Sequence, residues 1–237
     1  MKKFRSVVVA IAASAAVMAV HASEAQIRKA LAAAYPDIPI ASVKSSPLPG
    51  LFEVVVGADI LYADADGKHL IQGAIIDVAT KKNLTEERLQ VVNKVDFKEL
   101  PLDRAIVQKY GTGQRKMVVF ADPNCGFCKR LEREQIPLLK DVTIYTLLIP
   151  ILSEDSVVKS KAIWCASDRA KAWDDWMQRA VAAPAAPESC DVAAIDANLA
   201  LARKIRVTGT PTMFFESGAR LPGAVPAPDI EKHLAVK

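Results

Sequence analysis

The pattern of apolar and polar positions is clearest in the C-terminal half of the chain, where it predicts an α/β domain. Two apolar runs, residues 117–121 and 142–149, predict buried strands, and residues 129–140 between them predict a helix. Later segments predict a long helical region, a further helix, two strands and a last helix, at residues 156–181, 189–204, 212–215, 220–221 and 228–234. The predicted order is therefore β-α-β, a helical insertion, then β-β-α.

The N-terminal part, from Ser23 to about residue 83, predicts a small α+β unit. It contains a short helix, three strands and one turn, at residues 25–34, 51–56, 60–63, 70–78 and 64–67. A unit of about 60 residues buries little apolar surface alone. The strand over 70–78 is long and apolar, and an unpaired strand edge of this kind pairs readily with other chains. Both observations suggest that this unit pairs with another chain.

A helix follows, with Asn83 or Thr85 as its cap and with three apolar residues on one face, Leu89, Val92 and Val95. The stretch after this helix contains Pro101 and ends in a glycine-rich turn. We interpret residues 85–113 as a connecting helix and hinge. The alternative is an ordinary helix packed on one globular body, which would show the same apolar face.

Residues 1–22 have the organisation of a secretory signal peptide. Basic residues precede an apolar run over residues 7–20, and small residues follow up to Ala22 or Ala25, the expected cleavage points. A membrane anchor is disfavoured because the run is short and rich in alanine. Cleavage would remove three basic residues and lower the formal net charge from +4 to +1. The basic residues that remain form no stripe in the sequence that would indicate a nucleic-acid partner.

The sequence Cys125-Gly126-Phe127-Cys128 lies between the first predicted strand and helix of the C-terminal half. Free N–H groups and the partial positive charge at a helix start stabilise a thiolate over a thiol. We therefore expect Cys125 to be an exposed nucleophile with a low pKa. Cys128 would lie on the same helix face, close enough to form a disulfide with it. This pattern is typical of a thiol–disulfide exchange site.

Other interpretations of the two cysteines are weaker. A closed zinc site needs four ligands, and neither the other two cysteines nor the three histidines show ligand spacing. Haem attachment requires a histidine directly after the second cysteine, where Lys129 stands. A purely structural disulfide would not need a strand-to-helix setting. We expect no metal.

The mature chain would carry four cysteines, and export would permit disulfides. Three pairings are possible. The motif favours Cys125–Cys128, which leaves Cys165–Cys190 as a structural pair that ties the helical region to the next helix.

Pro211 stands directly before a predicted strand, where proline is tolerated. Its peptide conformation does not follow from composition.

Several separated motifs carry a resemblance to a known family. The Cys-Gly-Phe-Cys sequence and Gly209-Thr210-Pro211 resemble the thioredoxin superfamily. Nearly the whole mature chain resembles the DsbC-type protein disulfide isomerases of the bacterial periplasm, through GKHLIQG at residues 67–73, AIWCA at 162–166, SCDV at 189–192 and LPG at 221–223. The resemblance implies an α+β N-terminal dimerisation domain and an α/β thioredoxin-like catalytic domain with a helical insertion. The expected boundaries are 1–22 for the signal peptide, 23–84, 85–113 for the connector, and 114–237.

The resemblance also implies the roles of individual residues. Cys125 would be the attacking thiolate and Cys128 the resolving thiol. Pro211 would be cis, and the backbone of Thr210 would pair with an extended substrate. The Cys165–Cys190 pair would match the structural disulfide of the family.

The implied protein is a periplasmic homodimer that reduces and isomerises incorrect disulfides in misfolded exported proteins. A membrane reductant would keep its site reduced, without any soluble cofactor. The chain departs from the family at Phe127, where tyrosine is usual, and at residues 150–153 after the second strand, which changes the surface near the site. Two alternatives stay open: a dithiol oxidase that donates its disulfide, and a periplasmic chaperone or holdase whose cysteines are incidental.

Overall fold

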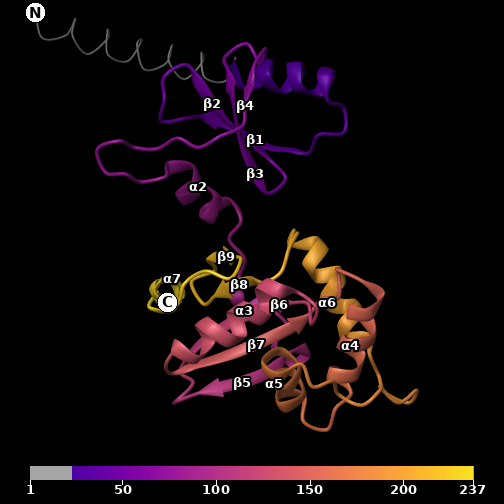
Figure 1. Ribbon diagram of the computed structural model, residues 1–237. Helices are drawn as coiled ribbons and strands as arrows, with labels where there is room; N and C mark the ends of the chain where they lie inside the picture. The colour runs from indigo at the N-terminus through magenta and orange to yellow at the C-terminus, as the bar shows by residue number, and fades with distance from the viewer. Residues whose placement is uncertain (1–22, 237) are drawn as a thin grey trace, which may run out of the picture. The chain divides into compact units, whose positions relative to one another are not determined.

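Two separate β-sheets organise the chain, one in each of two units that divide between Val92 and Asn93. The computed structural model describes residues 23–236, so the predicted signal peptide lies outside the described residues. Figure 1 shows the order of the elements along the chain. No helix within residues 23–236 is long and apolar enough to cross a membrane.

The N-terminal unit is a four-stranded antiparallel meander with a helix on each face. Its strands follow one another in order, β1 (Ile40–Ser45), β2 (Leu51–Val56), β3 (Asp59–Asp64) and β4 (Leu70–Ile71). A helix over residues 23–34 packs on one face through Ile27 and Leu31. Helix α2 (Leu84–Val92) packs on the other face, where Leu89 and Val92 contact a cluster built on Tyr62. The expected α+β unit is thus present.

Two strands of this unit differ from the prediction. The sequence did not predict β1, and the predicted strand over 70–78 was wrong beyond Ile71. After β4 the chain leaves β3 and turns toward the start of α2, because the N–H of Ile75 donates to Thr85 Oγ1 at 2.9 Å and Ile76 bridges to Asn83. Apolar side chains of this segment are left at the surface: Ile71 is 49 % exposed and Val78 is 88 % exposed.

The C-terminal unit has a five-stranded sheet in the order β5-β7-β6-β8-β9. The strands are β5 (Ile106–Tyr110), β6 (Arg115–Ala121), β7 (Val142–Leu148), β8 (Thr212–Phe215) and β9 (Arg220–Pro222). β6 and β7 pair in parallel and the other neighbours pair antiparallel. The helices are α3 (Gly126–Arg130), α4 (Glu154–Trp164), α5 (Arg169–Arg179), α6 (Ala193–Lys204) and α7 (Ala227–Leu234). From β6 onward this is the predicted thioredoxin-like order; the sequence did not predict β5.

Alternating side chains of β6 divide the core of this unit into two layers. Met117 and Val119 face a cluster that includes residues of α3, α4, α5 and α7. Val118 and Phe120 face the opposite cluster, which contains Phe97 and residues of α6. All four of these β6 side chains are buried, as a strand covered on both faces requires.

The structure differs from the expectation that residues 85–113 form a connecting helix and hinge. α2 ends at Val92, and the N–H of Val95 then donates to the carbonyl of Gly218 in the C-terminal unit. Phe97 and Leu100 are buried there, and β5, within the same range, pairs with β7. The sequence did not show that these residues belong to the C-terminal unit, because Pro101 and the glycines at 111 and 113 are typical of a flexible linker. In the structure they form turns beside an edge strand.

The long predicted helical region is two helices. α4 ends at Trp164 and α5 begins after Asp168, whose side chain caps it by accepting a hydrogen bond from Lys171 N. The helix after Cys125 is also irregular, because α3 continues as a π-helical turn over Leu131–Gln135 and a 3-10 turn over Ile136–Leu138. Trp164 and Trp173, one from each of these two helices, are both buried in the core.

Candidate active site

Cys125 is placed at the carboxyl end of β6, where the strand turns into α3. Its own N–H donates to the carbonyl of Asp122 at 3.1 Å, which closes the turn after the strand. Cys125 occupies the N-cap position, with φ −69° and ψ 118°, and its Sγ accepts a hydrogen bond from the N–H of Cys128 at 3.3 Å. The first turn of the helix therefore directs a backbone donor at the sulfur.

Asp122 binds this turn to the loop that follows β7. Its carboxylate is fully buried and accepts four hydrogen bonds, from Asn124 N, Ile151 N, Leu152 N and Ser156 Oγ, at 2.8 to 3.0 Å. The parallel pairing of β6 and β7 brings both carboxyl ends to the same edge of the sheet. Sequence analysis missed Asp122; the available signal was an acidic residue directly after the apolar run at residues 117–121.

Thr210 and Pro211 lie against Cys125, although 85 residues separate Thr210 from it in sequence. The Cys125 thiol donates to the carbonyl of Thr210 at 3.1 Å, and the Thr210–Pro211 peptide bond is cis. Hydrogen bonds hold this loop in place: Gly223 N donates to Pro211 O, and Thr212 Oγ1 donates to Gly209 O. The structure thus brings together the four predicted site residues.

The two cysteines have opposite electrostatic surroundings. The hydrogen bond with Cys128, aided by Thr210 and by the N–H groups of Cys128 and Phe127, lowers the pKa of Cys125 to about 6. Burial raises the pKa of Cys128 far above its ordinary value, and the hydrogen bond with Cys125 adds to this. Cys125 is therefore a thiolate at neutral pH, whereas Cys128 stays protonated.

One expectation about Cys125 was wrong. Sequence analysis expected an exposed nucleophile, but the residue is only 5 % exposed because the Thr210–Pro211 loop covers it. Both cysteines of the motif are free thiols, which corresponds to the reduced form of the site. Within residues 23–236, no three histidine, cysteine, aspartate or glutamate side chains gather as a metal site.

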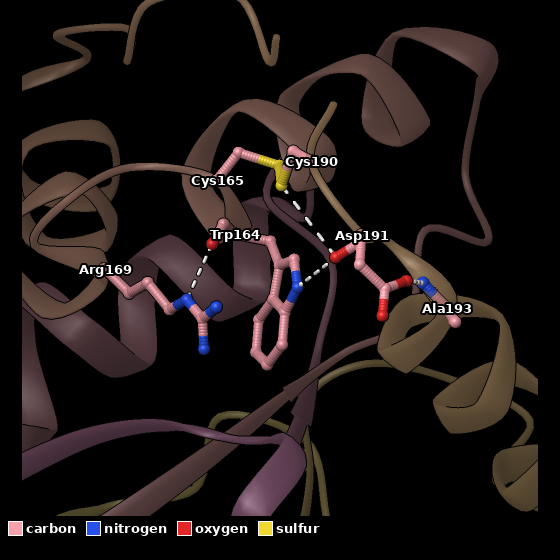
Figure 2. The surroundings of a disulfide bond; sticks show 6 residues. All are labelled: Trp164, Cys165, Arg169, Cys190, Asp191 and Ala193. Atoms are coloured by element: carbon pink, nitrogen blue, oxygen red, sulfur yellow. Dashed lines mark hydrogen bonds between the residues drawn. A yellow bond between two sulfur atoms is a disulfide. The ribbon is translucent and has the colours of Figure 1, made fainter. Parts of the chain in front are cut away.

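A disulfide joins the other two cysteines, Cys165 and Cys190 (Figure 2). It connects the end of α4 to the segment before α6, across 25 residues of sequence. Trp164 packs beside it and donates from Nε1 to the carbonyl of Asp191 at 3.0 Å. Arg169 stacks on the Trp164 ring at 3.6 Å and donates to its carbonyl. The bridge belongs to a packed junction between the end of α4 and the segment before α6, outside the Cys125–Cys128 motif.

Comparison with known proteins agrees with this geometry. Residues 18–86 match the family described as disulfide bond isomerase protein N-terminal domain, and residues 102–236 match the family described as thioredoxin-like domain. The probable thiol:disulfide interchange protein DsbC of Bordetella pertussis is 44 % identical over 208 residues, 88 % of this chain and 73 % of that protein. The chain belongs to the DsbC family.

A more distant member of the DsbC family, the thiol:disulfide interchange protein DsbC of Escherichia coli K12, is 33 % identical over 90 % of this chain and 88 % of its own length. Among solved structures, a disulfide interchange protein from Neisseria gonorrhoeae is similar, with 37 % identity and a TM-score of 0.51. That match covers 57 % of this chain and 96 % of the other chain. The family resemblance and the predicted fold class are confirmed.

Proposed function

We propose that this protein is a thiol–disulfide interchange enzyme that reduces and isomerises incorrect disulfides in exported proteins. The observation that carries the proposal is the contrast within the motif, where Cys125 has a pKa of about 6 beside a buried, protonated Cys128. Membership of the DsbC family supports the same activity. Cys125 is the attacking thiolate and Cys128 is the resolving thiol.

The reaction follows from thiolate chemistry. The Cys125 thiolate attacks one sulfur of a client disulfide, so that a Cys125–client disulfide forms and the other client sulfur leaves as a thiolate. A second client thiolate then attacks the client sulfur, which creates a new client disulfide and restores Cys125. Alternatively, Cys128 loses its proton and attacks Cys125, which leaves a Cys125–Cys128 disulfide and a reduced client. The second route needs a dithiol reductant, and we propose that a membrane protein supplies it.

Thr210 and Pro211 are the proposed substrate-binding residues. Their loop lies within hydrogen-bonding distance of Cys125, so a client whose sulfur is bonded to Cys125 must pass beside the Thr210 backbone. The lowered pKa also makes Cys125 a good leaving group, because a stable thiolate is released readily. Entry into the mixed disulfide and exit from it are both fast for this reason.

The remaining assignments concern assembly and location. We propose that residues 23–84 form a dimerisation domain and that the protein acts in the periplasm after loss of residues 1–22. The apolar side chains of Ile71 and Val78 support the dimer, since a single copy leaves them at the surface. The Cys165–Cys190 bridge has a structural role.

Reactivation of a scrambled protein with several disulfides tests the function. The mature chain, reduced beforehand, should restore activity to this substrate, and Cys125→Ser should abolish that recovery. Cys128→Ser should still form mixed disulfides but release them slowly. Cys165→Ser/Cys190→Ser should retain exchange, because that pair lies outside the motif.

Two other outcomes would contradict the proposal. The low pKa of Cys125 stabilises the reduced form and so makes the disulfide form oxidising. If the protein oxidised reduced substrates rapidly but failed to reactivate scrambled ones, it would be a dithiol oxidase. If Cys125→Ser kept full activity in preventing aggregation and the wild type showed no exchange, it would be a chaperone.

A further inference from the structure

The turn that leads into Cys125 is held by two of the helices inserted between β7 and β8. Trp176, in α5, donates from its indole Nε1 to the carbonyl of Pro123 at 2.6 Å. The next residue, Asn124, donates from its side-chain amide to Asp155 of α4 at 2.7 Å. These pairs are separated by 53 and 31 residues in sequence. Two hydrogen bonds therefore connect the helical insertion to the residues just before the reactive cysteine.

A tight turn from Asp122 to Cys125 determines where the Cys125 sulfur lies. The N–H of Cys125 donates to the carbonyl of Asp122 across this turn, and Asn124 N donates to the Asp122 carboxylate. Pro123 has no N–H, so its carbonyl is the only hydrogen-bonding group of its backbone. Because Pro123 is buried, that carbonyl would be unfavourable without a donor. The indole N–H of Trp176 supplies this donor and so stabilises the turn in one position.

The ring of Trp176 is itself held by two lysines. Lys129 Nζ, in α3, lies 4.6 Å from the ring centroid, and Lys159 Nζ, in α4, lies 4.7 Å from it. An ammonium group over an aromatic face is attracted by the electron density of the ring. Lys159 also forms an ion pair with Asp155, which accepts the amide of Asn124. Three helices therefore meet at this ring and direct its N–H toward the turn.

We propose that Trp176 is a positioning residue through which the helical insertion fixes the turn before Cys125 and keeps its sulfur on the N–H groups of α3. The inference rests on the proposed function and concerns the same site. Cys125 Sγ accepts the N–H of Cys128 at 3.3 Å, and a shift of the turn would lengthen and weaken this hydrogen bond. Trp176 acts on the sulfur through the Pro123 carbonyl.

A less firmly held turn would stabilise the thiolate of Cys125 less. The thiolate gains more from the N–H groups than the thiol does, because a charged acceptor forms the stronger hydrogen bond. The titratable side chains in contact with the turn or the indole stay unchanged when only the indole N–H is removed: Asp122, Cys128, Lys129, Asp155 and Lys159. A change in the ionisation of Cys125 would therefore report the position of its sulfur and not a lost charge.

Trp176→Phe tests the inference, because it removes the donor and keeps an aromatic ring for the lysines. Iodoacetamide alkylates a thiolate, so its rate with the reduced protein over a range of pH measures the ionisation of Cys125; Cys128 is buried and protonated. We expect the midpoint of this profile to rise by about half a pH unit, about a three-fold change in the ionisation constant. Above both midpoints the variant should react at least as fast as the wild type, because a thiolate of higher pKa is the stronger nucleophile.

Trp164→Phe is the matched control. Trp164 also donates from its indole to a backbone carbonyl, that of Asp191 at 3.0 Å, and it also has a cation on its ring, from Arg169. Its contacts join the end of α4 to the segment before α6, outside the motif. This variant should lose thermal stability as Trp176→Phe does, but its alkylation midpoint should equal that of the wild type.

A measurement on the unaltered protein covers the case in which Trp176→Phe does not fold. The hydrogen bonds of the turn link the indole N–H of Trp176 to the Cys125 sulfur. In a proton NMR titration, the signal of this N–H should therefore shift with the midpoint of Cys125, and Cys125→Ala should remove the shift. The indole N–H of Trp164 should not follow Cys125.

The outcomes separate this inference from the proposed function. An unchanged midpoint in folded Trp176→Phe, or a Trp176 signal that does not follow Cys125, would overturn the positioning role, while reactivation of a scrambled protein by the wild type would still support the function. Equal midpoint shifts in Trp176→Phe and Trp164→Phe would also overturn it, since loss of stability alone would then explain both. The expected shift in a protein that fails to reactivate scrambled substrates would support the positioning role and contradict the function.

Discussion

Cys125 and Cys128 are three residues apart and have the same chemistry in an unfolded chain, yet the fold gives them different roles. Cys125 is at the helix start, where N–H groups and the Thr210 loop surround its sulfur. Cys128 points into the core and is 1 % exposed. The position of each sulfur relative to the helix start and the core therefore supports the proposed roles of Cys125 as the attacking thiolate and Cys128 as the resolving thiol.

We predict that the thiolate absorbance of the reduced protein titrates with a midpoint near pH 6, and that Cys125→Ala removes this transition. The sign of the effect on stability follows from proton binding. Between about pH 6 and pH 9, the folded chain has an ionised Cys125, whereas the unfolded chain keeps the proton. The free energy of unfolding of the reduced protein should therefore rise with pH across this window, relative to Cys125→Ala. Below about pH 6 this contribution of Cys125 to stability should be lost. A midpoint near pH 9 would contradict the assigned geometry.

Glu132 is a second residue whose titration the fold changes. Its carboxyl is buried and accepts a hydrogen bond from Trp173 Nε1 at 2.7 Å, and burial, aided by nearby Asp174, raises its pKa to about 7. Between about pH 4.5 and pH 7 the folded chain keeps a proton that the unfolded chain has lost, so stability falls as pH rises. Sequence analysis did not find this group, because a glutamate in a charged helical stretch carries no sign of burial.

Glu132→Gln keeps an acceptor for Trp173 and removes the titration. We predict that this variant and the wild type have similar stability near pH 4, and that the variant becomes more stable by about 3 kcal/mol at pH 7 and above. Urea unfolding at several pH values measures the difference. Glu134→Gln is a suitable control, because Glu134 lies in the same helical run but is exposed. A constant difference at all pH values would show that Glu132 is ionised in the folded protein.

At the scale of single elements, α2 is bound to the N-terminal sheet and is not a free connector. Arg88 donates from Nε to both oxygens of Glu53 in β2, at 2.9 and 3.1 Å, and the hydroxyl groups of Tyr62 and Thr85 form a buried hydrogen bond. The sequence predicted the helix with Asn83 or Thr85 as its cap, and the structure shows Asn83 accepting a hydrogen bond from Glu86 N. The helical period showed an apolar face, but it did not show which sheet this face would contact.

We predict that Arg88→Met destabilises the N-terminal unit by about 2 kcal/mol, because it leaves the carboxylate of Glu53 buried without a partner. Replacing both residues, as Glu53→Gln/Arg88→Met, should recover part of this loss. Arg28→Met provides the control, since its ion pair with Glu24 is more exposed and should contribute less than about 0.5 kcal/mol. Thermal unfolding of the full chain measures all three. Equal effects of Arg88→Met and Arg28→Met would contradict the importance of this contact.

At the scale of the whole molecule, the N-terminal unit is too small to cover its own apolar edge. β4 pairs with β3 over two residues only, and the segment that follows leaves Ile71 and Val78 at the surface. A second copy of the chain is the proposed partner for this segment. The sequence predicted this pairing from the small size of the unit, its apolar pattern and the family resemblance. The structure adds which side chains a single chain leaves exposed.

We predict that the mature chain sediments as a dimer, and that Val78→Glu weakens the association by at least about ten-fold, because it would bury a charge in an apolar contact. Val107→Glu, at an exposed position on β5, should leave the dimer unchanged. Sedimentation equilibrium over a range of concentrations measures both. A monomer at every concentration would contradict the dimer, and an unchanged association in Val78→Glu would place the interface elsewhere.

The sequence by itself determined the features that depend on local pattern and spacing. The strand before Cys125, the order of the elements that follow it and the paired cysteines could be predicted, because periodicity and motif spacing are local properties. The roles of Thr210 and Pro211 followed only from the family resemblance. Tertiary structure decided which residues far apart in sequence meet. Only the fold brought Asp122 to the loop after β7, covered Cys125 with the Thr210 loop, and paired β5 with β7. The physical reason is that burial and hydrogen-bond partners are set by the whole packed chain, and these set the pKa values, exposure and contacts of the site.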